Sequence, residues 1–200
     1  MANVSAIYSV GDSLTAYLRH AYELTRVDEG LPSASFALCH AGEMIGTENG
    51  ADPVDKPGVT LYLYRVTVNE HLRNDGGQSG TPALTVNLHY LLTVWAESAK
   101  VEHQITAWVM RTLHTHQALG PSDLTPDGGW GTGELVQIIP AEISLEDTTR
   151  IWSALHRPFR PSFTYIARGV PIGIAPPPTG KPVVARRLAF SSSSGTEGGQ

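Results

Sequence analysis

The 200-residue sequence contains a single cysteine, no long apolar run and no excess of basic residues. The lone Cys39 excludes an intrachain disulfide framework and fits assembly in a reducing cytoplasm, and we expect it to be a small buried residue. The N-terminal residues lack the basic segment and the cleavage site of a secretory signal. No apolar stretch approaches the roughly 18 residues of a membrane span. We therefore expect a soluble chain with no membrane partner.

Acidic residues outnumber basic residues in the sequence. Lys and Arg number 14 against 19 Asp and Glu, which gives a net charge of −5 with neutral histidines. Binding to nucleic acid or to an anionic membrane surface normally needs a basic excess. We therefore expect no nucleic-acid partner, and other proteins are the open class of partner.

The spacing of apolar residues predicts three helices. In residues 5–26 they recur at steps of three and four, which places them on one helical face. A long helix is predicted over residues 98–118, with Gly120 as its C-terminal cap. A short helix should begin after Ser144, whose hydroxyl can cap it. The apolar face of the first helix consists of Ile7, Val10, Leu14, Leu18 and Ala21.

Alternating apolar residues predict strands between these helices. The two longest runs, 59–69 and 84–95, are separated by a polar, glycine-rich segment typical of a mobile hairpin loop, so they should pair antiparallel. Shorter strands are predicted at 36–39, 134–140 and 162–170. The expected fold class is α/β (α+β), with an antiparallel or mixed central sheet packed by the long helix.

Residues 1–170 are expected to form this one domain, and residues 171–200 a flexible C-terminal arm. Gly and Pro supply 10 of the 30 residues of the arm, which has too little apolar surface to offset the entropy cost of ordering it. One cluster stands out within it: Val183, Val184, Arg186, Arg187, Leu188 and Phe190. The cluster either docks as an extended segment on the exposed sheet edge of a neighbouring copy or belongs to a simple spacer, and composition does not separate these alternatives.

One short motif points to an enzyme. Gly11-Asp12-Ser13-Leu14 matches the nucleophile block of GDSL-type serine esterases. That chemistry needs a histidine base oriented by an aspartate, in an Asp-x-x-His pattern late in the chain. No such pattern occurs here, because Ser153 stands three residues before the late His156. We expect Ser13 to be a helical residue rather than a nucleophile, and the esterase is the enzymatic alternative.

No pattern predicts a metal site or a cofactor. The sequence has no His-Glu-x-x-His and no paired cysteines, and a Gly-rich stretch at 129–133 precedes a strand instead of opening a helix, so it is not a phosphate loop. We expect that stretch to be a flexible connector. Trp95 and Trp130 are candidate interface anchors, because aromatic residues concentrate in interface cores. The alternative for both is ordinary packing.

Three sequence blocks occur in a recognisable order around the long predicted helix. They are LYLYRVTVNEHLRN at 61–74, LTVNLHYLLTVWA at 84–96 and SLEDTTRIWSALHRPFRPSFTY at 144–165. Together they resemble the N-terminal domain of the cap family of contractile injection systems over residues 5–170. Members of that family carry a fuller strand after the last tyrosine, whereas this chain soon reaches Gly169 and Pro171, so the length of its last strand stays open.

The resemblance implies a structural protein without a cofactor. Members of the cap family form a ring on the distal end of the inner tube and sheath, and the ring stops the polymerisation of both. For this chain the ring is expected to be six-fold. The expected partners are other copies of this chain, the inner tube protein and the sheath protein. The expected location is the cytoplasm during assembly and then the particle, which is released on cell lysis. The non-enzymatic alternative is another tail-associated adaptor, such as a joining protein.

Overall fold

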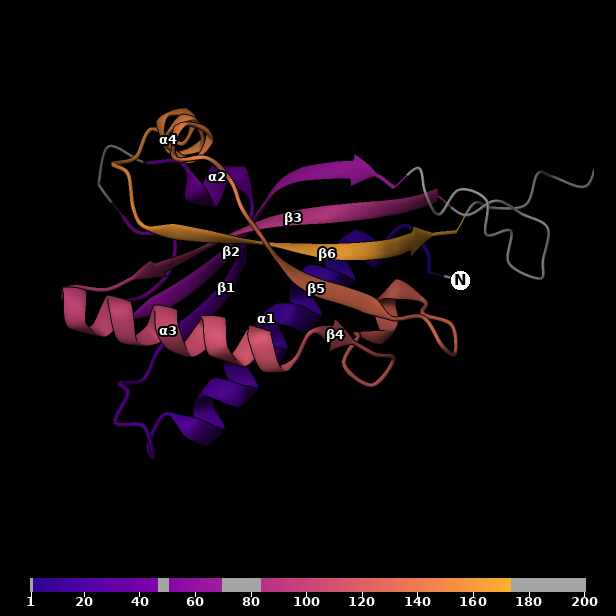
Figure 1. Cartoon of the computed structure of the whole chain (residues 1–200), viewed down its shortest axis with the longest axis horizontal. Coiled ribbons are helices and arrows are strands. Elements are labelled where there is room, and N and C mark those ends of the chain that lie inside the picture. The colour runs from indigo at the N-terminus through magenta and orange to yellow at the C-terminus, as the bar shows by residue number, and fades with distance from the viewer. Residues whose placement is uncertain (1, 47–50, 70–83, 174–200) are drawn as a thin grey trace, which may run out of the picture.

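The computed structural model describes residues 2–46, 51–69 and 84–173, and Figure 1 shows them as one sheet with helices packed around it. The elements in chain order are α1 (Ala6–Thr25), β1 (Ser35–Cys39), α2 (Ala41–Met44), β2 (Gly58–Val68), β3 (Leu84–Trp95), α3 (Ala99–Thr115), β4 (Ala118–Leu119), the 3-10 turn η2 (Pro126–Gly128), β5 (Val136–Ala141), α4 (Leu145–Ala154) and β6 (Ser162–Ile172). The predicted hairpin loop and the arm beyond Gly173 lie outside the described residues.

The described strands form a curled mixed sheet in the order β1-β2-β3-β6-β5-β4. β1 and β2 run parallel, and the other neighbours run antiparallel. The predicted antiparallel pair of β2 and β3 is confirmed, with Leu61 opposite Leu92. β2 contains a bulge between Leu63 and Arg65, and a bulge increases the local twist of a strand. The last strand extends to Ile172.

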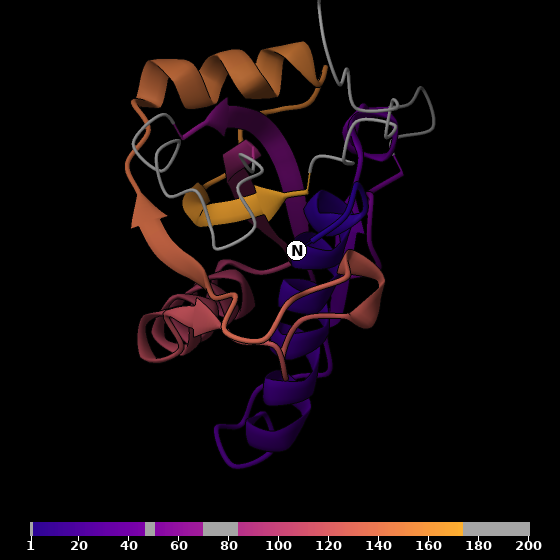
Figure 2. The ribbon, with the colours of Figure 1, turned by 90° about the vertical axis from the view of Figure 1, so that its right-hand side faces the viewer.

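Helices α1 and α3 cover one face of the sheet, which we call the inner face (Figure 2). The predicted apolar face of α1 packs there, and its central residues Val10, Leu14 and Leu18 are fully buried. The two helices also contact each other, since the rings of Tyr22 and Trp108 meet edge to face with their centroids 4.8 Å apart. The main apolar core of the chain therefore lies between the sheet and these two helices.

Helices α2 and α4 cover one end of the opposite face, which we call the outer face. A second apolar cluster lies under them, made of Cys39, Met44, Trp95, Trp152 and Leu155. The predicted N-cap of α4 is confirmed, because the Oγ of Ser144 accepts the N–H of Asp147 at 3.0 Å. Such a cap stabilises a helix by about 1 kcal/mol. Farther along the outer face, residues of the strands and of α4 line an open hollow.

The predicted end of the long helix is wrong. α3 ends at Thr115 and not near residue 118, and Gly120 does not cap it. Leu119 is instead fully buried in β4, which pairs with β5. The N–H of Gly120 donates to the carboxylate of Asp123 at 2.9 Å in the turn that follows. Burial of the Leu119 side chain in the sheet stabilises the fold more than a longer helix would. A local sequence pattern does not indicate this, because the partner strand lies later in the chain.

Candidate interaction site

Ser13 has a structural role in the core. It lies inside α1, as predicted, with 1% of its surface exposed. Its Oγ donates to the carbonyl of Ser9 at 2.6 Å and accepts the N–H of Thr125 at 2.8 Å. Within the described part of the chain, no histidine forms a hydrogen bond with this hydroxyl. Ser13 joins α1 to the loop before η2, and the esterase alternative finds no support.

Gly11 of the same motif also has a packing role. A Cβ at this position would lie 2.9 Å from both methyl groups of Leu38 and 3.1 Å from the hydroxyl oxygen of Tyr90. The missing side chain lets β1 and β3 approach α1 closely. Gly11 and Ser13 of the motif are therefore explained by the packing of α1 and by its contact with the loop before η2.

The described residues contain no group of three or more His, Cys, Asp or Glu placed to hold a metal ion. Cys39 is buried as predicted, with 5% of its surface exposed. Burial, helped by the carboxylate of Glu43, raises the pKa of its thiol from the ordinary 9.0 to about 11. The thiol is therefore neutral at physiological pH and is poorly suited to be a nucleophile or a ligand. No helix in the described part of the chain is long and apolar enough to cross a membrane.

The Gly-rich stretch around Trp130 packs on α1 rather than standing free as a connector. Trp130 is partly buried, and its Nε1 donates to the Oγ of Ser9 at 2.9 Å. The N–H of Asn3 donates to the carbonyl of Gly128 at 2.8 Å on the same loop. A Cβ at Gly128 would collide with the indole nitrogen of Trp130. Part of the Trp130 ring stays accessible, so its role as an interface anchor stays a proposal.

Trp95 packs inside the subunit with only 1% of its surface exposed. Its Nε1 donates to the Oγ1 of Thr60 at 2.9 Å, and its ring meets that of Trp152 at 6.0 Å. The guanidinium groups of Arg157 and Arg160 lie 5.3 Å and 4.7 Å from the ring centroid. Trp95 therefore packs within the chain, and its role as an interface anchor stays a proposal. The arm residues Val183, Val184, Arg186, Arg187, Leu188 and Phe190 lie outside the described residues.

The outward edge of β2 is only half paired, a feature that the sequence prediction missed. β1 pairs with Gly58–Tyr62, and no described residue pairs with Leu63–Val68 on that side. We call Leu63–Val68 the open edge. Val66 and Val68 expose 46% and 58% of their surfaces. A strand edge with unpaired N–H and C=O groups is a template for another strand.

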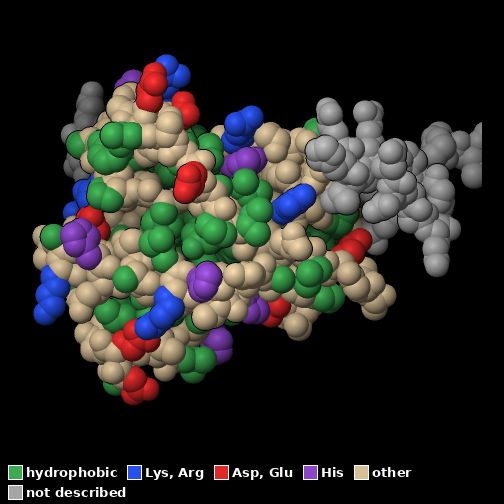
Figure 3. Space-filling view, in the orientation of Figure 1, with side chains coloured by type: hydrophobic (Ala, Val, Ile, Leu, Met, Phe, Trp, Pro, Cys, Tyr) green, Lys and Arg blue, Asp and Glu red, His purple; other side chains and the backbone are tan. Residues whose placement is uncertain are grey.

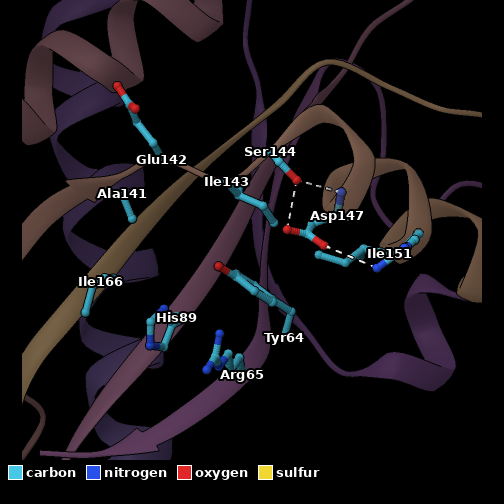
Figure 4. Close-up of a pocket in the computed structure, with 11 residues that line it drawn as sticks. Tyr64, Arg65, His89, Ala141, Glu142, Ile143, Ser144, Asp147, Ile151 and Ile166 are labelled. Atoms are coloured by element: carbon cyan, nitrogen blue, oxygen red, sulfur yellow. Dashed lines mark hydrogen bonds and ion pairs between the residues drawn. The ribbon is translucent and has the colours of Figure 1, made fainter.

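A hollow of about 470 Å³ adjoins the open edge on the outer face, and we call it the outer hollow (Figure 4). Its apolar part includes Ile143 and Ile166, and the side chain of Tyr64 points into it from the bulge of β2. Burial and the nearby Asp147 raise the pKa of Tyr64, although Arg65 opposes them. The full lining is Tyr64, Arg65, His89, Ala141, Glu142, Ile143, Ser144, Asp147, Arg150, Ile151 and Ile166.

A larger groove, about 680 Å³, lies on the inner side of the same edge, and we call it the inner groove. It begins where β1 ends and is mainly apolar, with Tyr8 of α1 exposing 60% of its surface along it. Tyr90 also lines the groove, and its buried hydroxyl has no hydrogen-bond partner among the described residues. The full lining is Val4, Ile7, Tyr8, Leu38, Cys39, His40, Ala41, Glu43, Tyr62, Leu63 and Tyr90.

Apolar side chains also gather over β5 and β6, between α3 and α4 (Figure 3). A further hollow of about 420 Å³ lies there, lined by Met110, Pro140 and Phe163 among others. Met110 and Phe159 expose 46% and 47% of their surfaces. Exposed apolar patches of this kind mark contact surfaces between proteins more often than catalytic sites. The described residues thus present several open, partly apolar surfaces.

A family model described as the Pvc16 N-terminal domain matches residues 10–186. The chain belongs to this family. The resemblance to a cap family that the three sequence blocks indicated is confirmed, since they lie within the matched range. No curated protein matches the sequence.

Two solved structures share the fold of this Pvc16 N-terminal domain. The sheath/tube terminator of the extracellular contractile injection system PVC, in its extended state, matches with a TM-score of 0.56 and 18% identity over 96% of this chain. The tube-terminating cap of the anti-feeding prophage AFP matches with a TM-score of 0.52 and 17% identity over 90% of this chain. The matches span 64% and 60% of those longer chains.

Proposed function

We propose that this chain is a structural, non-enzymatic cap that terminates the inner tube and sheath of a contractile injection particle. The single observation that carries the proposal is the family match over residues 10–186, together with a fold shared with two terminators of such particles. The open apolar surfaces of the subunit support it, because a cap works by contact with its neighbours. The partners are the tube protein, the sheath protein and other copies of this chain.

We further propose that the copies form a closed six-fold ring. A tube and sheath grow by repeated head-to-tail contacts, and such a stack has no intrinsic stop. A ring that matches the symmetry of the last layer covers the surface on which the next layer would assemble. The chain would join the particle in the cytoplasm and leave the cell with it on lysis.

Deletion of the gene tests this function. Without the cap we expect tubes and sheaths of irregular length, because addition continues until subunits are exhausted. Length distributions measured by electron microscopy decide the question, and a plasmid copy of the gene should restore a narrow distribution. Particles of normal, uniform length in the deletion strain would overturn the proposal. Negative-stain images of the purified protein test the ring separately, since monomers at every concentration would contradict it.

A further inference from the structure

The open edge has a binding surface on each side. Leu63 lines the inner groove, and the next two residues, Tyr64 and Arg65, line the outer hollow. β1 ends at Cys39, so the space in line with it along β2 is free of any described strand. A strand placed there would send alternate side chains into the groove and the hollow.

The residues that line the inner groove include a buried tyrosine. Tyr90 is 1% exposed, and its hydroxyl has no partner in the described part of the chain. A buried polar group without a hydrogen bond costs about 1–3 kcal/mol, so such groups are rare and usually find a partner. The apolar walls of the groove fit a peptide that brings an apolar side chain.

We propose that the open edge binds residues 183–190 from the arm of a second copy of this chain, as an added strand. The segment is eight residues long, and the open edge Leu63–Val68 offers six positions. Leu188 and Phe190 are two apart, so a strand puts both on one side, facing the inner groove. Arg187 then faces the outer hollow, whose lining has two acidic residues, Glu142 and Asp147, as well as two basic ones, Arg65 and Arg150.

Charge favours the same pairing. Residues 174–200 contain three Lys or Arg and one Glu, a net charge of +2, and the whole chain carries −5. The part of the chain that precedes residue 174 therefore carries −7. A basic arm and an acidic body attract each other, which favours docking over a free spacer.

The chain path favours a second copy over the arm's own body. β6 ends at Ile172 beside Leu84, at the end of the sheet where β2 also ends. In the sheet β3 lies between β6 and β2, and β2 is followed by β3 at this same end, so an arm that returned to the outward edge of its own β2 would make a connection that crosses this one. Connections in protein sheets rarely cross each other in this way. Nine residues, 174–182, lie between Gly173 and the docking segment, and fully extended they can span about 30 Å, roughly the diameter of a small domain.

This inference rests on the proposed function only in requiring that copies of the chain associate. In a ring, each arm would occupy the open edge of the next subunit, and the last arm would close the circle. Main-chain hydrogen bonds would supply affinity, and the two lined surfaces would set register and specificity.

Cross-linking between two full-length variants tests the proposal. One carries Val66→Cys and the other Leu188→Cys, both with Cys39→Ala, and they are mixed and treated with a short bismaleimide. Since each chain has one thiol, a covalent heterodimer forms only if the arm reaches a second copy. We expect a yield at least several-fold above that of a matched control in which Leu24→Cys, an exposed position near the C-terminal end of α1, replaces Val66→Cys.

Two outcomes would overturn the proposal. Cross-linking confined to single chains that carry both cysteines would show that each arm binds its own body. Absence of cross-links both in the mixture of the two variants and in the chain that carries both cysteines would exclude docking at this edge. Arg187→Glu should lower the heterodimer yield several-fold, whereas Ser191→Glu, just beyond the segment, should lower it much less. The assay contains neither tube nor sheath, so a negative cross-linking result would not contradict the proposed role of the cap in setting tube and sheath length.

Discussion

The indole nitrogen of Trp130 lies 2.9 Å from Ser9 Oγ and donates a hydrogen bond to it. The same hydroxyl bonds to the carbonyl of Thr125 at 3.0 Å. Ser9 therefore holds two parts of the loop around η2 against α1. This contact joins residues more than a hundred positions apart and fixes the loop that carries one candidate interface anchor.

Ser9→Ala should destabilise the subunit. The substitution removes the shared partner of Trp130 and Thr125 at a fully buried position. We expect the free energy of unfolding to fall by about 1–3 kcal/mol, measured by urea denaturation. Ser153→Ala, at an exposed position of α4, is the matched control and should change it by less than about 0.5 kcal/mol. Equal effects of the two changes would contradict the role given to Ser9.

Tyr90→Phe should stabilise the isolated subunit. The change removes a buried hydroxyl without a partner among the described residues and keeps the ring that packs in the core. We expect the free energy of unfolding to rise by about 1 kcal/mol. Tyr22→Phe is the control with the opposite sign, because the Tyr22 hydroxyl donates to the carbonyl of Pro32 at 2.8 Å. A loss of stability with Tyr90→Phe would mean that this hydroxyl already has a partner in the free subunit.

The thiol of Cys39 should make stability fall at alkaline pH. Burial raises the pKa of this thiol from 9.0 to about 11, so the folded state holds the proton more tightly than the unfolded state. The resulting contribution to stability is fully present below pH 9 and is lost as the pH rises from about 9 to 11. Urea denaturation at pH 8 and pH 10 should show a larger loss for the natural sequence than for Cys39→Ala.

The same thiol should resist alkylation in the native protein. Iodoacetamide at pH 8 should modify Cys39 slowly when the chain is folded and quickly in urea, because only the thiolate reacts and burial also blocks access. Mass spectrometry over time measures both rates. Rapid modification of the folded protein would contradict the buried, neutral state of this residue.

Arg157→Lys should destabilise the subunit although it keeps the charge. The guanidinium donates to the carbonyls of Met44 and Ala51 at 2.7 Å each, and its side chain is 8% exposed. A lysine cannot reproduce this fork of donors, and a loss of about 1–3 kcal/mol in the free energy of unfolding is expected. Arg168→Lys, at an exposed strand position, is the control. A similar loss in both variants would show that the fork at Arg157 is not required.

The sequence by itself determined the elements whose signal is local. The period of apolar residues located α1, and the Ser144 cap located the start of α4, because capping and amphipathicity act within a few residues. The lengths of β2 and β3 and their antiparallel pairing also followed from alternation and the segment between them. The resemblance to the cap family could also be found from the sequence, because each of the three blocks that carry it is a contiguous stretch of chain.

Only the tertiary structure decided which surfaces stay open. The parallel pairing of β1 with half of β2 leaves the outward side of Leu63–Val68 without a partner among the described strands, and strand neighbours depend on contacts distant in sequence. The mismatch between a five-residue β1 and an eleven-residue β2 was a signal that could have indicated this edge. Trp95 and Trp130 look alike in sequence, yet one is buried between α4 and the sheet and the other stays partly accessible. Burial is a property of the assembled layers, so no local pattern distinguishes the two.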